Sequence, residues 1–393
     1  MKTFLEMAQE MQNELVSIRR DFHQHPELSW KEYETTKRIK EYLTSWGIEV
    51  IPWGGDTGVI GLLKGAEDGP VVALRGDIDA LPVTEETGES FASVNEGCMH
   101  ACGHDIHITT ILGAAALLAK KKDELKGSVK FIFQPAEEAI NGADTMVKHG
   151  VLENPQVDAV FGVHNNPELR AGQIGLKPGP LMAATDGVYL TVKGRGGHGG
   201  IPNLCVDPVV AAAAIITNMQ SIIARRISPL DSAVISWGSI HAGEANHVIP
   251  DSVTMSGTVR SYRKEVQAKL KEEMERVIHN TAASYGCTAD FEYRYGLPVV
   301  DNDKVLAEWL KSPLGKVFGD GVIEPIPNTG AEDFAFYMEK VPGVFLWLGV
   351  GNPEQGICQP WHSPKFRMDE SALALGAAGF AQLAFDYVNE FKK

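Results

Sequence analysis

The sequence predicts an α/β protein in which a mostly parallel β-sheet is flanked by helices and a smaller α+β module is inserted. Four apolar runs lack the alternation of a half-exposed strand: residues 71–75, 129–133, 158–163 and 344–348. Such continuous runs are typical of parallel strands covered on both faces. A chain of 393 residues is also too long for one ordinary core, which favours two domains.

The composition is that of a globular protein, with 44% hydrophobic residues and a net charge of −15. The negative charge disfavours binding to nucleic acid and to anionic membranes. We expect no signal peptide and no membrane span, because no apolar run approaches the ~20 residues that a span needs. The five cysteines are odd in number and widely spaced, so we expect a reducing, cytoplasmic location.

Residues 3–47 have the pattern of two helices, and a strand is expected at 57–64. The helix residues expected to be buried are Phe22, Ile39, Tyr42, Leu43 and Trp46. His23 and His25 lie between the two helices, next to Pro26. That position favours a structural role, or a place in a substrate channel, over metal binding.

Carboxylates follow two of the apolar runs. Asp77 and Asp79 come after the first, and residues i and i+2 of an extended segment lie on the same side. Turn chemistry explains this pair equally well. Glu137 and Glu138 come after the second run. Adjacent acids repel unless something compensates, so one could bind a metal ion while the other reaches a water molecule. A helix N-terminus, where acids are favoured, is the alternative.

A cysteine and a histidine occur two residues apart in the segment 99–105, at Cys102 and His104. Gly103 between them allows a backbone turn, and a helical apolar pattern begins directly afterwards. Thiolate and imidazole at this spacing can reach one soft or borderline metal ion, such as zinc. Taken alone, the motif is better explained by a buried free cysteine beside a helix cap.

Two further histidines follow apolar runs: His164 comes after 158–163 and His362 after 344–348 and a loop. Each alone favours a structural role. Together with the carboxylates they fall at the carboxyl ends of parallel strands, where open α/β sheets bind ligands. The candidate ligands are numerous enough for two divalent cations: Cys102, His104, Glu138, His164 and His362.

The middle of the chain has the pattern of a separate βαββαβ module. Its expected elements are strands at 186–193, 231–241, 252–260 and 287–294, with helices at 207–224 and 263–284. This order predicts a ferredoxin-like α+β fold. We therefore expect a larger domain of residues 1–183 and 298–393, with an inserted domain at 184–297. The glycine-rich segment 194–200 around His198 lacks the setting of a dinucleotide-binding loop.

Five motifs together resemble the M20 metallopeptidase family, and its amidohydrolase branch in particular. They are residues 75–82, 99–105, 134–138, 162–164 and 362–364. The resemblance spans essentially the whole chain. It implies a zinc-exopeptidase-like fold and a two-metal site in which Cys102 bridges the ions, with His104, Glu138, His164 and His362 as further ligands. It also implies that Glu137 is the general base and that Asp79 orients the ligands from behind.

The sequence departs from the wider family pattern at one place. Where the family has His-x-Asp, this chain has Asp77-Ile78-Asp79, so one usual ligand is lost and His104 is expected to replace it. The resemblance further implies that the inserted domain is a lid that mediates dimerisation. In the lid, His198 would polarise the scissile carbonyl, often across the dimer interface. Substrate-binding positions are implied at Asn246 and Arg260, and at Gly330 in the loop 330–334.

The resemblance implies hydrolysis of N-acyl amino acids, such as N-acetyl or N-benzoyl derivatives, to a carboxylic acid and a free amino acid. Two divalent ions per subunit are expected, from zinc, manganese, cobalt or nickel, in a homodimer or a dimer of dimers. A dipeptidase or aminopeptidase of the same family is the nearest alternative. Two alternatives come from other functional classes. A non-catalytic, metal-dependent binding protein is disfavoured because it would have no use for Glu137. A thiol hydrolase that uses Cys102 would keep its activity in a chelator and lose it with a thiol reagent.

Overall fold

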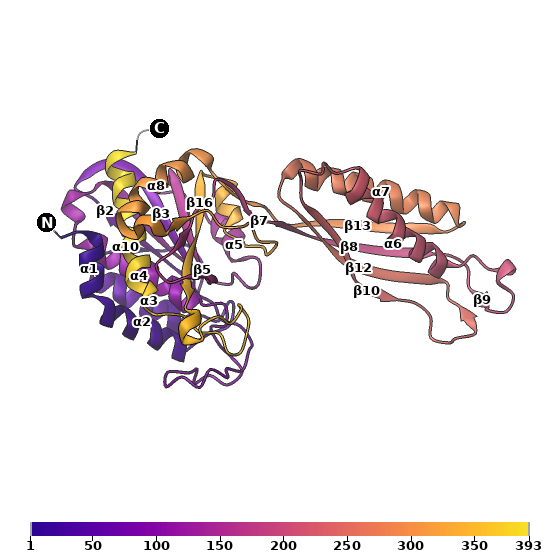
Figure 1. Cartoon of the computed structure of the whole chain (residues 1–393), viewed down its shortest axis with the longest axis horizontal. Coiled ribbons are helices and arrows are strands. Elements are labelled where there is room, and N and C mark those ends of the chain that lie inside the picture. The colour runs from indigo at the N-terminus through magenta and orange to yellow at the C-terminus, as the bar shows by residue number, and fades with distance from the viewer. Residues whose placement is uncertain (1, 392–393) are drawn as a thin grey trace. The chain divides into compact units, whose positions relative to one another are not determined.

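The computed structural model describes residues 2–391 and divides into two compact units (Figure 1). The first unit comprises the chain up to Gly179, residues Asp301–Ile326, and the chain from Glu332 onward. The second comprises Pro180–Val300 and Pro327–Ala331. The borders expected from the sequence leave 327–331 outside the inserted domain. The segment joins the second unit because the Ala183 N–H bonds to the carbonyls of Asn328 and Gly330.

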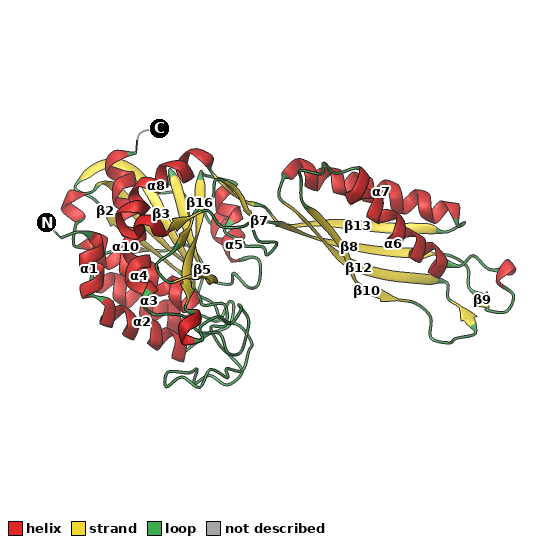
Figure 2. Ribbon diagram, viewed as in Figure 1, coloured by secondary structure: helices red, strands yellow, loops and turns green. Residues whose placement is uncertain are grey.

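The first unit is built on an eight-stranded, mostly parallel sheet, as predicted (Figure 2). Its order is β1-β2-β4-β3-β5-β16-β6-β15. The central pairs β4–β3, β3–β5 and β5–β16 are parallel. The strands are β1 (Glu49–Ile51), β2 (Val59–Lys64), β3 (Glu67–Asp77), β4 (Lys126–Gln134), β5 (Ala159–Arg170), β6 (Ile174–Gly175), β15 (Val322–Ile323) and β16 (Gly343–Gly351). Two short strands, β7 (Gly179–Met182) and β14 (Val300–Asn302), form a separate pair.

Helices pack against this sheet because its central strands are apolar on both faces. Helices α4 and α10 pack against each other and on β3, while α5 and α9 contact β4 and β16. Helix α4 is buried on almost all sides, so it lacks a polar face. The helices of this unit are α1 (Phe4–Glu10), α2 (Gln12–Gln24), α3 (Tyr33–Ser45), α4 (His104–Ala119), α5 (Gly142–Lys148), α8 (Lys304–Phe318), α9 (Ala335–Met338) and α10 (Ala372–Glu390).

Two expectations for this unit were wrong. Residues 3–47 form three helices rather than two, because a capping box at Thr3 starts α1 and the N–H of Met11 closes it on Ala8 and Gln9. The strand expected at 158–163 continues to Arg170, since its polar end still pairs with β16. His164 therefore lies within β5, beside Trp347 of β16, rather than after the strand.

The second unit has the predicted βαββαβ order. Its antiparallel sheet runs β10-β12-β8-β13, the strand order of a ferredoxin-like fold. The elements are β8 (Ala184–Lys193), α6 (Pro208–Arg225), β10 (Ala233–His241), β12 (Ser252–Ser261), α7 (Lys264–Ser284) and β13 (Thr288–Leu297). Burial alternates along β8, as expected for a sheet with one covered face.

One helix of the described chain, α6, is long and apolar enough to meet the composition criterion for a membrane span. We expected no apolar segment that approaches the length of a membrane span, and this 18-residue helix does approach it. Five apolar residues of α6 are nevertheless buried in the core of the second unit: Ala211, Ala212, Ile215, Met219 and Ile222. These residues form the face of α6 that packs into the core of the second unit.

Candidate metal centre

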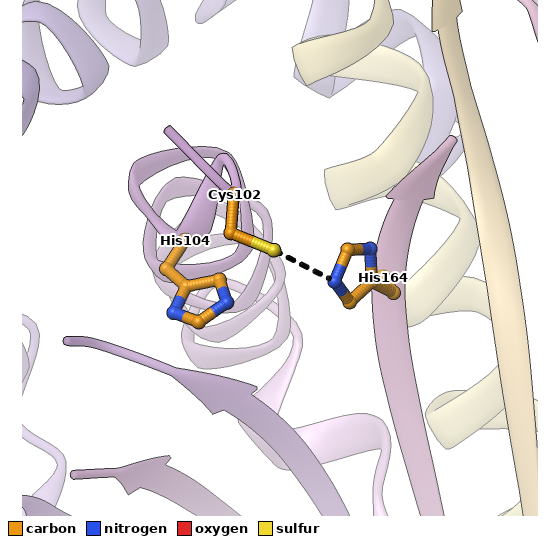
Figure 3. Close-up of side chains that lie close together, drawn as sticks. All are labelled: Cys102, His104 and His164. Carbon is orange, nitrogen blue, oxygen red and sulfur yellow. Dashed lines mark hydrogen bonds between the residues drawn. The ribbon is translucent and has the colours of Figure 1, made fainter. Parts of the chain in front are cut away.

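The thiol of Cys102 and the imidazoles of His104 and His164 lie close together where α4 begins beside β5 (Figure 3). Gly103 has φ 83°, a left-handed conformation that glycine adopts without a Cβ clash, and it is the N-cap of α4. Cys102 therefore lies just before the helix and His104 forms its first residue. The Sγ atom of Cys102 points toward His164 on β5, 3.4 Å from its Nε2 atom.

The five candidate ligands belong to one cluster within the first unit. Cys102 lies with His104 and His164 in one group, and with Glu138 and His362 in another. The ligand atoms of each group lie within 4.8 Å of one another. Because Cys102 belongs to both groups, its sulfur is placed where a bridging ligand would be needed. The roles of these residues as ligands remain predictions.

Asp79 connects three parts of the cluster. Its Oδ1 atom lies 3.2 Å from Nδ1 of His104. Its two oxygens accept the backbone N–H groups of Glu137 and Glu138, each at 3.1 Å. Asp79 thus fixes the ring of His104 and the turn that carries the two glutamates. A residue that orients metal ligands without binding the metal makes contacts of this kind.

Hydrogen bonds leave one nitrogen of each buried imidazole facing the cluster. Nδ1 of His164 donates to the carbonyl of Asn165 at 2.7 Å, so Nε2 keeps its lone pair toward Cys102. Burial, aided by His107, holds the pKa of His164 well below its ordinary value, so this ring is neutral. Among the described residues, Nε2 of His104 and Oε1 of Glu138 are buried without a hydrogen-bond partner.

The cluster carries an excess of negative charge. Burial lowers the pKa of His104, but the carboxylates of Asp77 and Asp79 outweigh it and raise the pKa to about 10. Burial, followed by Glu138 and Glu137, raises the pKa of the Cys102 thiol well above its ordinary value. Bound cations would supply the missing positive charge. The sulfur, nitrogen and oxygen donors, two of which lack a hydrogen-bond partner, therefore fit divalent metal ions such as zinc.

Glu137 and Glu138 lie in a turn rather than at a helix N-terminus, because α5 begins only at Gly142. Oε1 of Glu138 lies 3.4 Å from Nε2 of His362. Glu137 groups with Glu138 and His104, and it also groups with the buried carboxyls of Glu332 and Asp333. Burial and then these two acids raise the pKa of Glu137 well above its ordinary value. Both glutamates thus lie near His104, but Glu138 also reaches His362 whereas Glu137 also reaches two further acids. This arrangement suits a ligand beside a base.

His362 differs from the other candidates because 57% of its side chain is exposed. Its φ of 64° is rare for a residue with a Cβ atom. The backbone N–H of His362 bonds to the carbonyl of Ala101 at 2.9 Å, beside Cys102. This bond anchors the loop that brings the ring to Glu138.

The chain matches peptidase family M20/M25/M40 over residues 73–386. It belongs to this family. The chain is 46% identical to N-acetylcysteine deacetylase of Bacillus subtilis over 94% of its own length and 96% of that protein. It is 39% identical to the Arabidopsis thaliana protein IAA-amino acid hydrolase ILR1-like 4, covering 96% of this chain and 86% of that one. The crystal structure of the Bacillus subtilis YXEP protein, described as a dinuclear metal-binding peptidase of the M20 family, superimposes with a TM-score of 0.86 and 41% identity, covering 98% of this chain and all of that one.

The remaining residues suggested by the M20 resemblance belong to the second unit. His198 is exposed on β9 (Gly197–His198), paired with Val248 of β11 (Val248–Ile249). Its Nδ1 accepts the N–H of Gly200 at 2.9 Å, which leaves Nε2 available. Asn246 lies in the exposed turn just before β11. The structure thus places His198 and Asn246 on neighbouring segments.

Arg260 and Gly330 lie elsewhere in that unit. Arg260 is half-buried on β12, and it donates to Thr258 and to the carbonyl of Val259. Burial lowers its pKa. Gly330 is exposed, and its N–H bonds to the Asn328 side chain at 2.6 Å.

The sequence analysis missed several buried residues behind the cluster of this M20 chain. Arg75 donates to Asp77, Glu332 and Asp333. His107 bonds to Asp77 through Nδ1 and accepts the Asn165 N–H through Nε2. The spacing of His104 and His107 offered a signal, because residues i and i+3 share a helix face. Arg75 begins the motif 75–82, but no local pattern there indicated its partners Glu332 and Asp333.

Proposed function

We propose that this chain is a metal-dependent amidohydrolase that cleaves N-acyl amino acids, such as N-acetyl or N-benzoyl derivatives, into a carboxylic acid and a free amino acid. The observation that carries the proposal is that Glu137 lies in the cluster with Glu138 and His104 but has Glu332 and Asp333 as its further neighbours, whereas Glu138 has Cys102 and His362. A binding site alone needs ligands but no second carboxylate beside them. The similarity to a deacetylase and to an IAA-amino acid hydrolase supports the substrate class.

In this proposal Cys102, His104, Glu138, His164 and His362 hold two divalent ions, which would lower the pKa of a water molecule towards ~7. Glu137 takes the proton of the attacking water and delivers it to the leaving amine. Asp79 keeps His104 and the glutamate turn in place.

The second unit supplies substrate contacts in this proposal. His198 donates to the oxyanion that forms at the scissile carbonyl. The Arg260 guanidinium pairs with the α-carboxylate of the released amino acid, and Asn246 is a further substrate-binding residue. Gly330 lines the pocket.

We also propose a homodimer or dimer of dimers, in the cytoplasm, with zinc, manganese, cobalt or nickel as the metal. An exposed edge strand, β10, supports assembly through the second unit. Apolar side chains on β10 and α6 are partly exposed: Val209, Val210, Val234 and Ile240. The free cysteines support a reducing compartment. We propose no nucleic-acid or membrane partner, since the net charge is −15.

The alternative is a dipeptidase or aminopeptidase of the same family. It is supported by the description of the superimposed structure as a peptidase. The deciding experiment reconstitutes metal-stripped protein with each of the four metals and assays N-acetyl amino acids, N-benzoyl amino acids and dipeptides side by side. The proposal expects the highest kcat/KM on an N-acyl amino acid. Faster cleavage of dipeptides would establish the alternative. Activity that survives a chelator and fails with a thiol reagent would indicate a thiol hydrolase.

A further inference from the structure

The turn that carries the two glutamates contains residues in unfavourable backbone conformations. Ala136 has φ 54° and Ile140 has φ 63°, both in the left-handed region. A residue with a Cβ atom adopts this region only when its surroundings hold it there. The turn is closed internally by bonds from Ile140 N to the Glu137 carbonyl and from Gly142 N to the Ala136 carbonyl. These bonds leave the N–H of Ala136 to be satisfied from outside the turn.

A short segment before α3 provides that outside support. The Oε1 atom of Glu32 accepts the N–H of Ala136 at 2.9 Å. Trp30 donates from Nε1 to the Oδ1 atom of Asn141 at 3.0 Å, at the other end of the turn. Residues Trp30 and Glu32 therefore hold the turn at both ends.

The same segment also reaches Asp79, which accepts the next two N–H groups of the turn. Ser29 donates from its hydroxyl to Oδ2 of Asp79 at 2.7 Å. The N–H groups of Ala136, Glu137 and Glu138 thus each end on a carboxyl oxygen, the first from Glu32 and the others from Asp79. Three successive N–H groups held in this way leave the turn little freedom.

Glu32 is fully buried, and it lies immediately before the first residue of α3, Tyr33. Its carbonyl accepts the N–H of Thr36 in that helix, which fixes its backbone. The Oε2 atom has no hydrogen-bond partner among the described residues. Burial, with the charge of Asp79 adding to it, raises the pKa of Glu32 to about 7. A neutral acceptor is therefore well tolerated at this position.

We propose that Glu32 is a positioning residue whose carboxyl group holds Ala136 in its left-handed conformation and so sets the positions of Glu137 and Glu138. The effect on turnover rests on the proposed function. The effect on the turn itself does not.

The test compares Glu32→Gln with Glu32→Asp. The glutamine keeps an acceptor oxygen at the same distance and removes the charge, whereas the aspartate keeps the charge and withdraws the acceptor. We expect Glu32→Gln to retain near-wild-type kcat. We expect Glu32→Asp to lose about 10²-fold in kcat, the cost of a misplaced catalytic group, with little change in KM. Loss in Glu32→Gln with activity kept in Glu32→Asp would overturn the proposal, as would two fully active variants.

A second substitution tests the backbone conformation directly. Glycine adopts positive φ without a Cβ penalty. Adding Ala136→Gly to the Glu32→Asp chain should therefore restore much of the lost kcat. Glu27→Gln is the matched control, because its carboxylate accepts the N–H groups of Glu34 and Thr35 in α3 and none from the turn. An equal loss in Glu27→Gln would show a general effect of this segment and overturn the proposal, as would no rescue by Ala136→Gly.

Two readouts need no turnover. Hydrogen exchange of the metal-free protein, followed in a peptide spanning 134–142, should be faster in Glu32→Asp and unchanged in Glu32→Gln and Glu27→Gln. Metal affinity, measured against a competing chelator, should fall about 10–100-fold in Glu32→Asp because Glu138 is no longer held. If the wild-type protein cleaves no N-acyl amino acid, the proposed function fails, while these readouts still decide the role of Glu32. An unchanged rate of hydrogen exchange in the 134–142 peptide of Glu32→Asp would overturn the proposed role of Glu32.

Discussion

The Nη2 atom of Arg75 lies 2.8 Å from Oε1 of Glu332, a carboxyl group 257 residues further along the chain. The same nitrogen donates to Asp333 at 2.9 Å, and Nη1 donates to Asp77 at 2.8 Å. All four side chains are buried. The contact ties β3, which leads to Asp79, to the acids beside Glu137. One guanidinium thus joins the two sides of the candidate site.

Replacing Arg75 by methionine should lower the free energy of unfolding by about 3–5 kcal/mol, because three acidic side chains would lose their buried partner. Urea unfolding of the metal-free protein measures the change. Arg20→Met is the matched control, because Arg20 pairs with Glu370 and its side chain is 44% exposed. Its cost should be about 0–1 kcal/mol. A loss below about 1 kcal/mol for Arg75→Met would contradict the account of this network.

Cys102 should bind metal as a thiolate. Its raised pKa keeps the metal-free thiol protonated at neutral pH, so metal binding must release a proton and should tighten as pH rises. Titration of the stripped protein with cobalt(II) should therefore produce a sulfur-to-metal charge-transfer band. Cys102→Ser should lack this band and the exposed-cysteine control Cys358→Ser should retain it. The same band in Cys102→Ser would exclude ligation by this residue.

The buried carboxyl of Glu32 should make stability depend on pH. Its pKa is about 7 in the folded protein, compared with an ordinary value of 4.5. Between pH 4.5 and pH 7 the folded state therefore holds a proton that the unfolded state has lost. The contribution of Glu32 to the stability of the wild-type protein should therefore fall as pH rises from about 4.5 to 7. Over that window, Glu32→Gln should gain on the order of 3 kcal/mol relative to wild type. Urea unfolding of both metal-free proteins at several pH values checks this. A constant difference would be inconsistent with the raised pKa.

His198 should act on the substrate rather than on the metal. His198→Ala should lose most turnover and keep its metal content, because the residue belongs to the second unit. Mixing inactive His198→Ala chains with inactive Glu137→Gln chains tests whether it acts across a dimer interface. Recovered activity, with subunit exchange confirmed by mass, would show action in trans. Exchange without recovery would mean that each His198 serves its own chain.

The sequence predicts those parts of the site that depend on local pattern. Apolar runs revealed the central strands because burial on both faces removes polar positions, and Gly103 between Cys102 and His104 marked the turn into α4. The pairing of Arg75 with Glu332 could not be predicted, because it depends on how distant segments meet. The left-handed Ala136 was equally hidden, since its conformation is imposed by Glu32 rather than by its own side chain.

The central claim is that Glu137 moves a proton while Glu138 binds metal, and Glu137→Gln tests it most directly. The amide keeps the shape of the side chain and cannot act as a base. Metal content and kcat of the reconstituted variant should be measured on the same sample. The account predicts wild-type metal content and a kcat reduced about 10²–10⁴-fold. A variant that has lost its metal, or one that keeps wild-type turnover, would contradict it.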